Sequence, residues 1–384
     1  MAKRYPLSIT TILIFLTFFL TMLAPGAYSQ QATTGAEWKL RKQAADNVIR
    51  VVAEDVNSTS FRAASEIASL LAREDGLRLM TISGRGGAEN ISDLLFLRDI
   101  DLAIVSLDTL EKIKAENTFP KLERRVAYVT KLFNEEVHLL APEKATKIQD
   151  LAGRRIGVGP KEGSGDYSAR TIFGAANVQY KPVYDDYALA LLKLQKGELD
   201  AVISVSGKPV RMYENLPKTG LRLLPVPLDP ANMPDYIPAS ISADDYPRLI
   251  PAGETISTVS VQNVLLAFNW KQDTKRYRKV SSFINQFFPK AAALKKRPNH
   301  PKWQEFNMSA RLDNWIRVKA ATDAAAQPAV ASNLGSCSAA DLRAAFTQYL
   351  AEANISVAGE ISKTDAEQIF KGFKDWVNTS TANQ

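Results

Sequence analysis

The chain has 384 residues, of which 46% are apolar and 23% charged, enough apolar material for one or two large cores and too much for global disorder. The 19 glycines, 19 prolines and single cysteine exclude a collagenous chain, a disulfide scaffold and a Cys-rich metal module. Because there are only two histidines, we expect no metal centre or catalytic cluster built from histidine, and no cofactor.

Residues 1–29 have the features of a secretory signal peptide: a basic start, an apolar run from about Leu7 to Leu23, and small residues up to Ser29. An uncleaved membrane anchor is the alternative, although the apolar run is at the short end for a span. The single cysteine is Cys337, so a cysteine for lipid attachment is missing at the cleavage site. We therefore expect a periplasmic protein released by cleavage near Ser29.

Without this leader the chain has 46 basic and 41 acidic residues, a net charge of +5, which does not indicate a nucleic-acid partner. The basic residues are concentrated at 271–302, where ten of them accompany one acid, Asp273. A solvated helical face is the commoner interpretation of such a segment. A docking surface for an acidic partner or anionic lipid is the alternative.

Two segments alternate between β-branched runs and helical spacing of apolar residues, with short links, as in a parallel sheet with helices on its faces. The first is predicted to contain a strand at 48–53, a polar loop at 57–60, a helix around 64–71, a strand at 77–82, a glycine loop at 84–87, a helix around 91–95 and a strand at 102–105. The second is predicted to contain a strand at 137–140, a helical turn at 148–151, a strand at 156–158, helices around 169–176 and 188–192, and a strand at 201–203.

The rest of the chain is less regular. Seven prolines from Pro225 to Pro251 indicate a segment without regular structure. The predicted elements that follow are strand-like runs at 258–261 and 264–268 that return to the first unit, amphipathic helices around 273–288 and 301–317, an Ala-rich linker at 320–331, and a helix pair at 338–378.

Polar loops follow strands in both units, at the sheet edge where open α/β folds bind ligands. The stretch from Ser164 to Asp166 begins a predicted helix, whose free N–H groups suit a carboxylate or phosphate; an ordinary capped helix is the alternative. Residues 57–60 hold the equivalent position in the first unit, and N-capping explains them as well as ligand binding does. Two further loops also have two interpretations. Ser106 and Asp108 lie either at the edge of a pocket or at the cap of the next helix. Ser206 and Gly207 lie either at the edge of a pocket or in an ordinary turn.

The order of these motifs resembles the TAXI family of TRAP-transporter solute receptors, a branch of the type II periplasmic binding proteins. The resemblance covers roughly residues 46–318. The stretches that carry it are 86–90, 101–105, 148–159 with 163–165, 197–201, 206–209 and 250–253.

The resemblance implies an α/β fold with two lobes, two mixed sheets flanked by helices, and a C-terminal helical extension at 331–384. Lobe 1 is expected at 46–136 and 256–320, and lobe 2 at 137–255. The lobes are expected to close on a small carboxylate-bearing solute, such as an amino acid or dicarboxylate, for delivery to a TRAP-type membrane permease. The implied ligand-binding residues are Asn57, Ser58, Thr59, Ser106, Asp108, Ser164, Gly165, Asp166, Tyr184, Ser206 and Gly207.

Two features depart from the family pattern. The first loop contains Glu54 and Asp55 where the family is rich in Gly and Thr, and acids there would repel an anionic solute. A cationic, zwitterionic or neutral solute is therefore an alternative. The tail from about residue 331 is also additional, either as a packing appendage or as a docking module.

Two functions fit these residues, and a third has little to support it. The first is a secreted binding protein that is not an enzyme. The second is a receptor-like subunit with a degenerate ligand loop, which signals to or scaffolds a membrane partner through its tail. The third is an enzyme on the same fold. It has little support because His138 and His300 lack the spacing of a catalytic triad and suit core or surface positions.

Overall fold

The computed structural model describes residues 47–326 apart from 73–76, 215 and 217–219, together with residues 35, 38 and 39. The predicted signal peptide and the predicted C-terminal helix pair lie outside the described residues. None of the described helices is long and apolar enough to cross a membrane.

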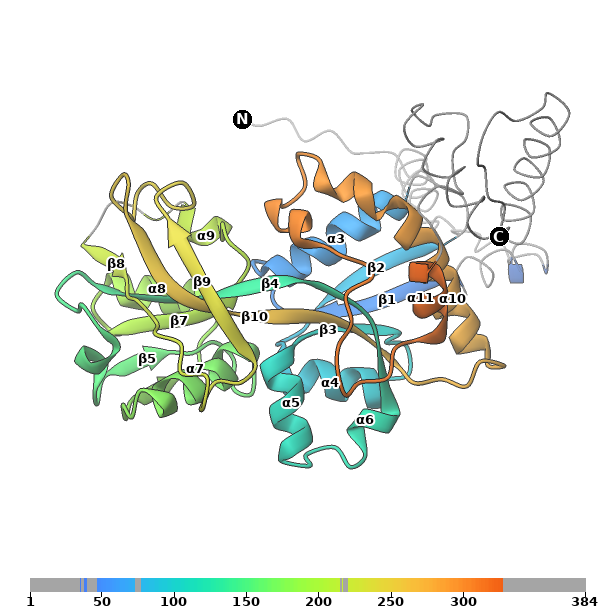
Figure 1. Cartoon of the computed structure of the whole chain (residues 1–384), viewed down its shortest axis with the longest axis horizontal. Helices are drawn as coiled ribbons and strands as arrows, with labels where there is room; N and C mark the ends of the chain where they lie inside the picture. The colour runs from blue at the N-terminus through green and yellow to red at the C-terminus, as the bar shows by residue number, and fades with distance from the viewer. Residues whose placement is uncertain are drawn as a thin grey trace, which may run out of the picture. The chain divides into compact units, whose positions relative to one another are not determined.

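Ten strands form one mixed sheet (Figure 1). Eight of them follow the order β2-β1-β3-β10-β4-β7-β5-β6, while β8 pairs with β4 and β9 with β10. Two long strands, β4 and β10, are antiparallel to one another in the middle of this order, where β10 also pairs with β3 and β4 with β7. The strands are β1 Val48–Ala53, β2 Arg78–Ser83, β3 Leu102–Ser106, β4 Val126–Pro142, β5 Arg155–Gly157, β6 Lys181–Val183, β7 Ala201–Ser206, β8 Leu221–Leu223, β9 Tyr236–Ser242 and β10 Thr255–Phe268.

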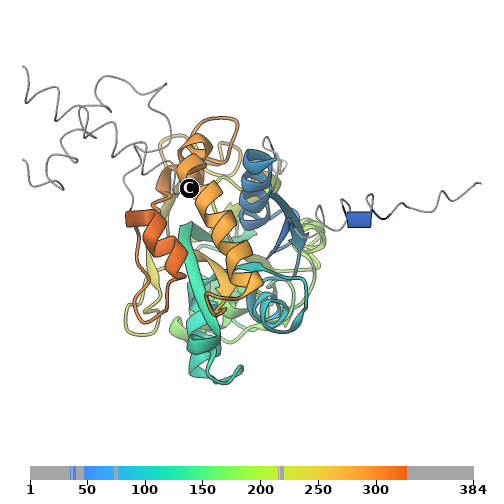
Figure 2. The ribbon, with the colours of Figure 1, turned by 90° about the vertical axis from the view of Figure 1, so that its right-hand side faces the viewer.

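Helices cover both faces of this sheet (Figures 1 and 2). The α-helices are α3 Thr59–Leu71, α4 Gly87–Phe96, α5 Leu107–Ala115, α6 Leu122–Arg125, α7 Ser164–Ala175, α8 Tyr187–Gln195, α9 Arg211–Glu214, α10 Lys275–Phe287 and α11 Lys319–Ala326. Three 3₁₀ helices are also present: η1 Ile148–Leu151, η2 Phe288–Lys295 and η3 Pro301–Glu305.

The apolar core is divided into four clusters. Two are built mainly from residues 49–133 and 264–321, a part of the chain that we call the first half, and one of them also contains Tyr167 of α7. The other two are built mainly from residues 137–250, which we call the second half. Of the strands that the structure describes, β4 and β10 alone extend into both halves, so they connect the halves through one sheet.

The predicted α/β fold with a helix-flanked, multistranded sheet is confirmed, although one continuous sheet replaces the two that were expected. The reason is that β4 and β10 are longer than the predicted strands and pair with each other across both halves, with register shifts after Gln262 and Leu265. Local sequence accounts for the helix starts. Ser58 caps α3 by accepting from the Phe61 N–H, and Asp186 caps α8 by accepting from the Leu189 N–H.

Three predictions of local structure are wrong. The Pro-rich segment contains β9, which accommodates Pro238 because β9 has only one neighbouring strand and Pro is tolerated at such an edge. The predicted helix at 301–317 is limited to the short η3, and the following residues form an irregular segment. Residues 320–326 of the predicted linker belong to α11, whose Ala321 is buried in the core of the first half.

Candidate functional site

The loops that follow β1 and β3 meet the loops that follow β5 and β7, and we call this meeting place the junction. Most of the junction is closed by direct contacts between the two halves. The cavity that remains is about 10 Å³, roughly the space of one water molecule. It is lined by Glu54, Asp55, Asn57 and Ser58 from the first half and by Tyr187, Ser204, Val205, Ser206, Val210 and Met212 from the second.

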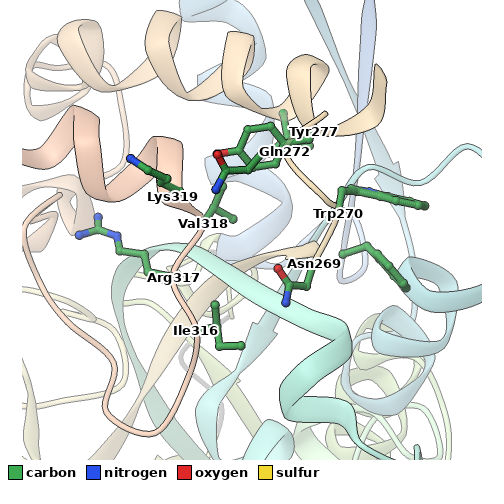
Figure 3. A pocket seen from close by; sticks show the side chains of 10 residues that line it. Asn269, Trp270, Gln272, Tyr277, Ile316, Arg317, Val318 and Lys319 are labelled. Atoms are coloured by element: carbon green, nitrogen blue, oxygen red, sulfur yellow. The ribbon is translucent and has the colours of Figure 1, made fainter. Parts of the chain in front are cut away.

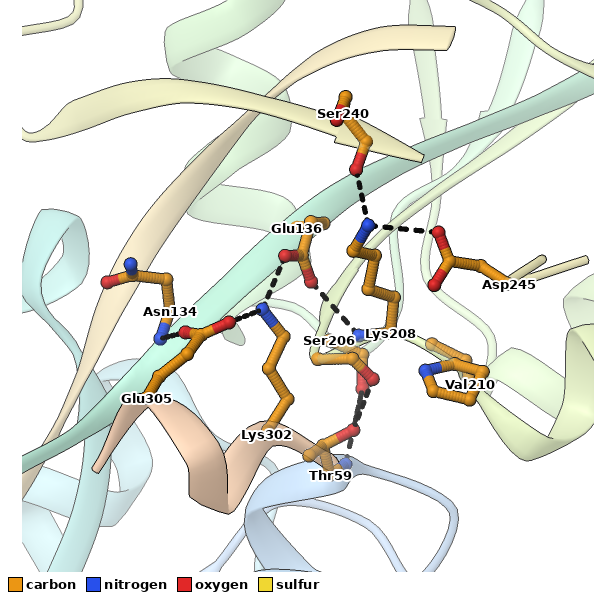
Figure 4. A network of polar contacts seen from close by, with 12 residues as sticks. Thr59, Asn134, Glu136, Ser206, Lys208, Val210, Ser240, Asp245, Lys302 and Glu305 are labelled. Carbon is orange, nitrogen blue, oxygen red and sulfur yellow. Dashed lines mark hydrogen bonds and ion pairs between the residues drawn. The ribbon is translucent and has the colours of Figure 1, made fainter. Parts of the chain in front are cut away.

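Thr59, the first residue of α3, connects the two halves (Figure 4). Its backbone N–H donates to Ser206 Oγ at 3.2 Å, and its Oγ1 lies 3.0 Å from the same hydroxyl. Thr59 Oγ1 also donates to the Gly207 carbonyl at 2.9 Å. Because these groups are buried, each bond contributes to holding the loop after β7 against the start of α3.

A second contact lies at the N-terminus of α7. Ser164 Oγ donates a hydrogen bond to Glu54 Oε1, and both side chains are buried. The free N–H groups of this helix start were expected to receive a carboxylate from a ligand. In the structure, the Glu54 carboxyl group of the chain itself is bonded to the side chain of Ser164, the first residue of this helix.

The glycine loop before α4 contacts the second half through its backbone. The Ala88 N–H donates to the Glu162 carbonyl at 3.1 Å. Gly87 has a φ of +54°, and a Cβ at this position would lie 2.1 Å from the same carbonyl oxygen. Only glycine meets both the backbone conformation and this close approach.

Asp108 forms the fourth contact. Its Oδ2 accepts a hydrogen bond from Ser168 Oγ at 2.8 Å and another from the Tyr236 hydroxyl. Tyr236 also lies 2.8 Å from Ser168 Oγ, so the three side chains form a closed buried set. Neutral hydroxyls from α7 and β9 therefore provide the donors for this carboxylate.

Acidic side chains dominate the electrostatics of the junction. Burial raises the pKa of Glu54 to about 8; the hydrogen bond from Ser164 opposes the rise, and the charges of Asp55 and Asp108 add to it. Burial also raises the pKa of Glu135 well above its ordinary range, and the charge of Glu54 adds to this rise. Glu135 is on β4 and was missed in the sequence, where it is one of two adjacent acids before an apolar strand.

A network of ion pairs connects the halves on the neighbouring part of β4 (Figure 4). Lys302 Nζ, from η3, lies 2.5 Å from Glu136 Oε1 and 2.6 Å from Glu305 Oε1. Glu136 Oε2 accepts from the Lys208 N–H at 3.0 Å, and Lys208 Nζ lies 2.9 Å from Asp245 Oδ2. Sequence reasoning treated Lys302 as part of a basic surface, but its side chain is only 4% exposed.

Both histidines are buried. His138 lies between the Glu136 carbonyl and the Tyr246 hydroxyl, at 2.9 and 2.8 Å, and burial lowers its pKa to about 3. Burial likewise lowers the pKa of His300 to about 4, and its Nδ1 accepts from the Lys302 N–H. Both rings are therefore neutral at pH 7 and have structural partners. Among the described residues, no group of three or more His, Cys, Asp or Glu side chains could hold a metal ion.

The structure brings eight of the predicted binding residues to the junction. Thr59, Asp108, Ser164, Ser206 and Gly207 form contacts between the halves, and Asn57, Ser58 and Ser206 line the cavity. Gly165 packs so closely on Tyr187, a cavity residue, that a Cβ there would lie 2.0 Å from the Tyr187 hydroxyl. Whether these residues bind a ligand stays a prediction.

The other three predicted residues make local contacts. Ser106 Oγ donates to Thr109 Oγ1 at 3.0 Å within the start of α5. Asp166 pairs with Arg170 on its own helix at 2.6 Å and accepts from the Glu162 N–H. Tyr184 is 45% exposed and does not line the cavity of the junction.

A larger pocket of about 150 Å³ lies away from the junction, beside α10 and α11 (Figure 3). Its walls combine apolar and basic side chains, among them Trp270, Tyr277, Ile316, Arg317 and Lys319. None of the predicted ligand-binding residues lines it. The polar loops of both halves converge elsewhere, at the junction.

A family model described as the NMT1-like family matches residues 57–279, more than half of the chain. The chain belongs to the NMT1-like family. The matched residues of this NMT1-like protein include Thr59, Asp108, Ser164 and Ser206, and so both sides of the junction. Glu54 lies just before the matched region. No curated protein matches the chain.

Several solved structures are similar to this chain. The periplasmic aliphatic sulphonate binding protein SsuA from Escherichia coli has 14% identity over 87% of this chain and 88% of that one, with a TM-score of 0.38. A ligand-binding component of an ABC-type import system from Staphylococcus aureus, with zinc bound, has 12% identity over 73% and 84%, with a TM-score of 0.43. The periplasmic VFT2 domain of BvgS from Bordetella pertussis has 14% identity over 65% and 90%, with a TM-score of 0.38. Similarities this low carry no argument about the ligand or partner of the NMT1-like protein.

Proposed function

We propose that this chain is an exported solute-binding receptor, not an enzyme, and that its two halves are the lobes of a type II periplasmic binding protein. Lobe 1 comprises residues 46–136 and 256–320, and lobe 2 comprises residues 137–255. The receptor holds a small polar solute at the junction, and ligand contacts stabilise the closed arrangement over an open one.

The observation that carries this proposal is the junction itself. Thr59 and Asp108 of the first half and Ser164 and Ser206 of the second are buried polar groups, three in the first turn of a helix and Ser206 at the end of a strand. They meet across the halves by hydrogen bonds and not by apolar packing. A receptor with two such halves can replace the hydrogen bonds between the halves with hydrogen bonds to a solute.

The proposed partner of the loaded receptor is a TRAP-type membrane permease in the same cell envelope. The motif order at residues 148–159 and 163–165 supports this choice. A periplasmic location follows from the predicted signal peptide.

Isothermal titration calorimetry against a panel of amino acids, organic acids and amines tests the proposal, together with small-angle X-ray scattering with and without each compound. A binding solute is expected to give a saturable heat and to change the radius of gyration. The absence of both for every compound would reject the receptor function.

One observation favours the second candidate, a receptor-like subunit that signals to or scaffolds a membrane partner. Glu54 and Ser164 already bond to each other at the position expected for a ligand carboxylate. Because its own side chains bond across the halves, the chain can hold the closed arrangement without a solute. Deleting residues 331–384 separates the candidates: solute affinity survives if the chain is a transport receptor, and recruitment of the membrane partner is lost if the tail carries the output.

A further inference from the structure

Two buried acceptor atoms at the junction have no hydrogen-bond partner. Glu135 Oε1, on β4, and Asn263 Oδ1, on β10, are unpaired, and their residues are 1% and 2% exposed. The two side chains are adjacent, since the Asn263 amide is close enough to lower the pKa of Glu135. An unpaired acceptor in the interior costs free energy, so this part of the sheet is prepared for donors that the chain does not supply.

Three more carboxyl groups belong to the same cluster, and Glu54 is the one of them that acts on Glu135 directly. Glu54 raises the pKa of Glu135, and Asp55 and Asp108 raise that of Glu54, so the four acids are close enough to interact. In the part of the chain that the structure describes, none of the four forms an ion pair with Lys or Arg. Their donors are the hydroxyls of Ser164, Ser168 and Tyr236 and nearby backbone N–H groups.

Of the groups that act on these acids, one is a cation shared with other carboxylates, and the others are neutral or acidic. Tyr187, on α8, is a neutral phenol whose pKa is raised first by burial and then by Glu54, with Asp55 and Glu135 adding to the rise. Glu136, on β4, is another acid and adds to the rise at Glu135. Lys302 is the cation that acts on Glu135, but it is already bonded to Glu136 and Glu305.

We infer that the solute held at the junction carries an ammonium or guanidinium group, which binds against Glu54, Glu135 and Asn263. This inference rests on the proposed receptor function and names the charge of its solute. A nitrogen cation has several N–H donors and no acceptor, and the acids with Asn263 Oδ1 present acceptors. It also supplies the positive charge that the buried carboxylates lack.

The same geometry disfavours an anionic solute. The N-terminus of α7 is the position best suited to a carboxylate, and Glu54 lies against it through Ser164. A ligand carboxylate placed there must displace Glu54 and remain beside Asp55 and Asp108. Like charges at that separation, away from water, cost affinity.

Proton release is the signature of the inference. The raised pKa of Glu54, about 8, means that this carboxyl is largely protonated at pH 7 before a cation binds. Binding of a cation favours the ionised acids and expels protons. Affinity is then expected to rise up to tenfold per pH unit for each proton released as the pH increases from 6 to 8.

The test is calorimetry on the mature chain with putrescine, agmatine, lysine and arginine as cations, glutamate and succinate as anions, and urea as a neutral donor. We expect at least one cation to bind, with a heat that depends on the ionisation enthalpy of the buffer. Glu135→Gln and Glu54→Gln are each expected to weaken cation binding at least tenfold at pH 8. Glu89→Gln is the control, because it removes one acid that is 41% exposed and paired with Arg85.

The outcomes are distinct. Tighter binding of glutamate or succinate than of every cation overturns the inference and leaves the receptor function in place. Unchanged amine affinity in both Gln variants overturns it as well. No binding and no change in scattering for all three classes rejects the receptor function, and the inference with it. Circular dichroism of the two Gln variants verifies that any loss is not a loss of folding.

Discussion

Thr59 and Ser206 are 147 residues apart in the sequence, yet they are joined by the Thr59 N–H and by a contact between their hydroxyls at 3.0 Å. Thr59 begins a helix of the first half, and Ser206 ends a strand of the second. Their bonds therefore form only when the two halves are together.

Thr59→Val tests this relationship, because it keeps the shape of the side chain and removes its hydroxyl. We expect the loss of about 1–2 kcal/mol from the closed arrangement, since the Gly207 carbonyl and Ser206 lose a buried partner. Hydrogen exchange at residues 204–210 should accelerate accordingly. Thr118→Val, at an exposed position, should change neither exchange nor stability; equal effects of both variants would contradict the assignment.

Gly87 and Gly153 offer a matched pair of substitutions. Both have positive φ, +54° and +70°, but a Cβ meets the Glu162 carbonyl at Gly87 and nothing within 4 Å at Gly153. Gly87→Ala should therefore cost more stability than Gly153→Ala, where only the backbone strain of about 1 kcal/mol applies. Urea unfolding measures both, and scattering should show an expanded molecule for Gly87→Ala alone. Equal stabilities of the two variants would mean that the loop at 84–87 is not in close contact with the second half.

The pKa of Glu54 predicts how stability depends on pH. Its folded pKa, about 8, is above the usual value of 4.5, so the folded chain holds a proton that the unfolded chain releases between these limits. The contribution of this group to stability is complete below pH 4.5 and is lost as the pH rises through 8, by up to about 1.4 kcal/mol per pH unit.

Urea unfolding of the wild type and of Glu54→Gln at several values from pH 5 to 8.5 checks this dependence. The variant should show a flatter profile, because its amide does not titrate. If the wild type instead becomes more stable over the same range and does not differ from the variant, Glu54 is ionised in the folded chain and other groups stabilise its charge.

Lys302 provides a fourth prediction. Its ammonium group is buried between Glu136 and Glu305, so Lys302→Met leaves Glu136 without its cation and should cost about 3–5 kcal/mol. Adding Glu136→Gln should recover much of this loss, since the unpaired charge is removed as well. Lys319→Met, which breaks an exposed pair with Asp323, should cost less than about 1 kcal/mol. Similar losses of stability in the two lysine variants would contradict the idea that the buried pair holds the two halves together.

The alternation of strands and helices could be predicted from the sequence because it depends on local periodicity. Thr59, Ser164 and Ser206 could be proposed for the same reason, as each follows or precedes a predictable element. The strand β9 could not, because a Pro-rich segment becomes a strand only when an edge such as that of β10 is present to receive it.

The acidic centre of the junction was only partly predictable. Glu54 was noticed because it departs from the pattern of a related loop. Glu135 and Asn263 carry no local signal for a shared site, since each lies among other polar residues of a long strand. They become neighbours only through the antiparallel pairing of β4 with β10, in which Glu135 is opposite Val261 and the register shifts between Gln262 and Val264.

That register shift has a mechanical consequence. The two halves share a ladder of hydrogen bonds along β4 and β10, so they cannot slide past each other without breaking it. The movement left to them is a torsion of this two-stranded ribbon, and an irregularity beside Glu135 is where such a ribbon yields most easily. A group that neutralises the charge of Glu135 therefore acts where the ribbon twists, and a small change of torsion there moves both halves.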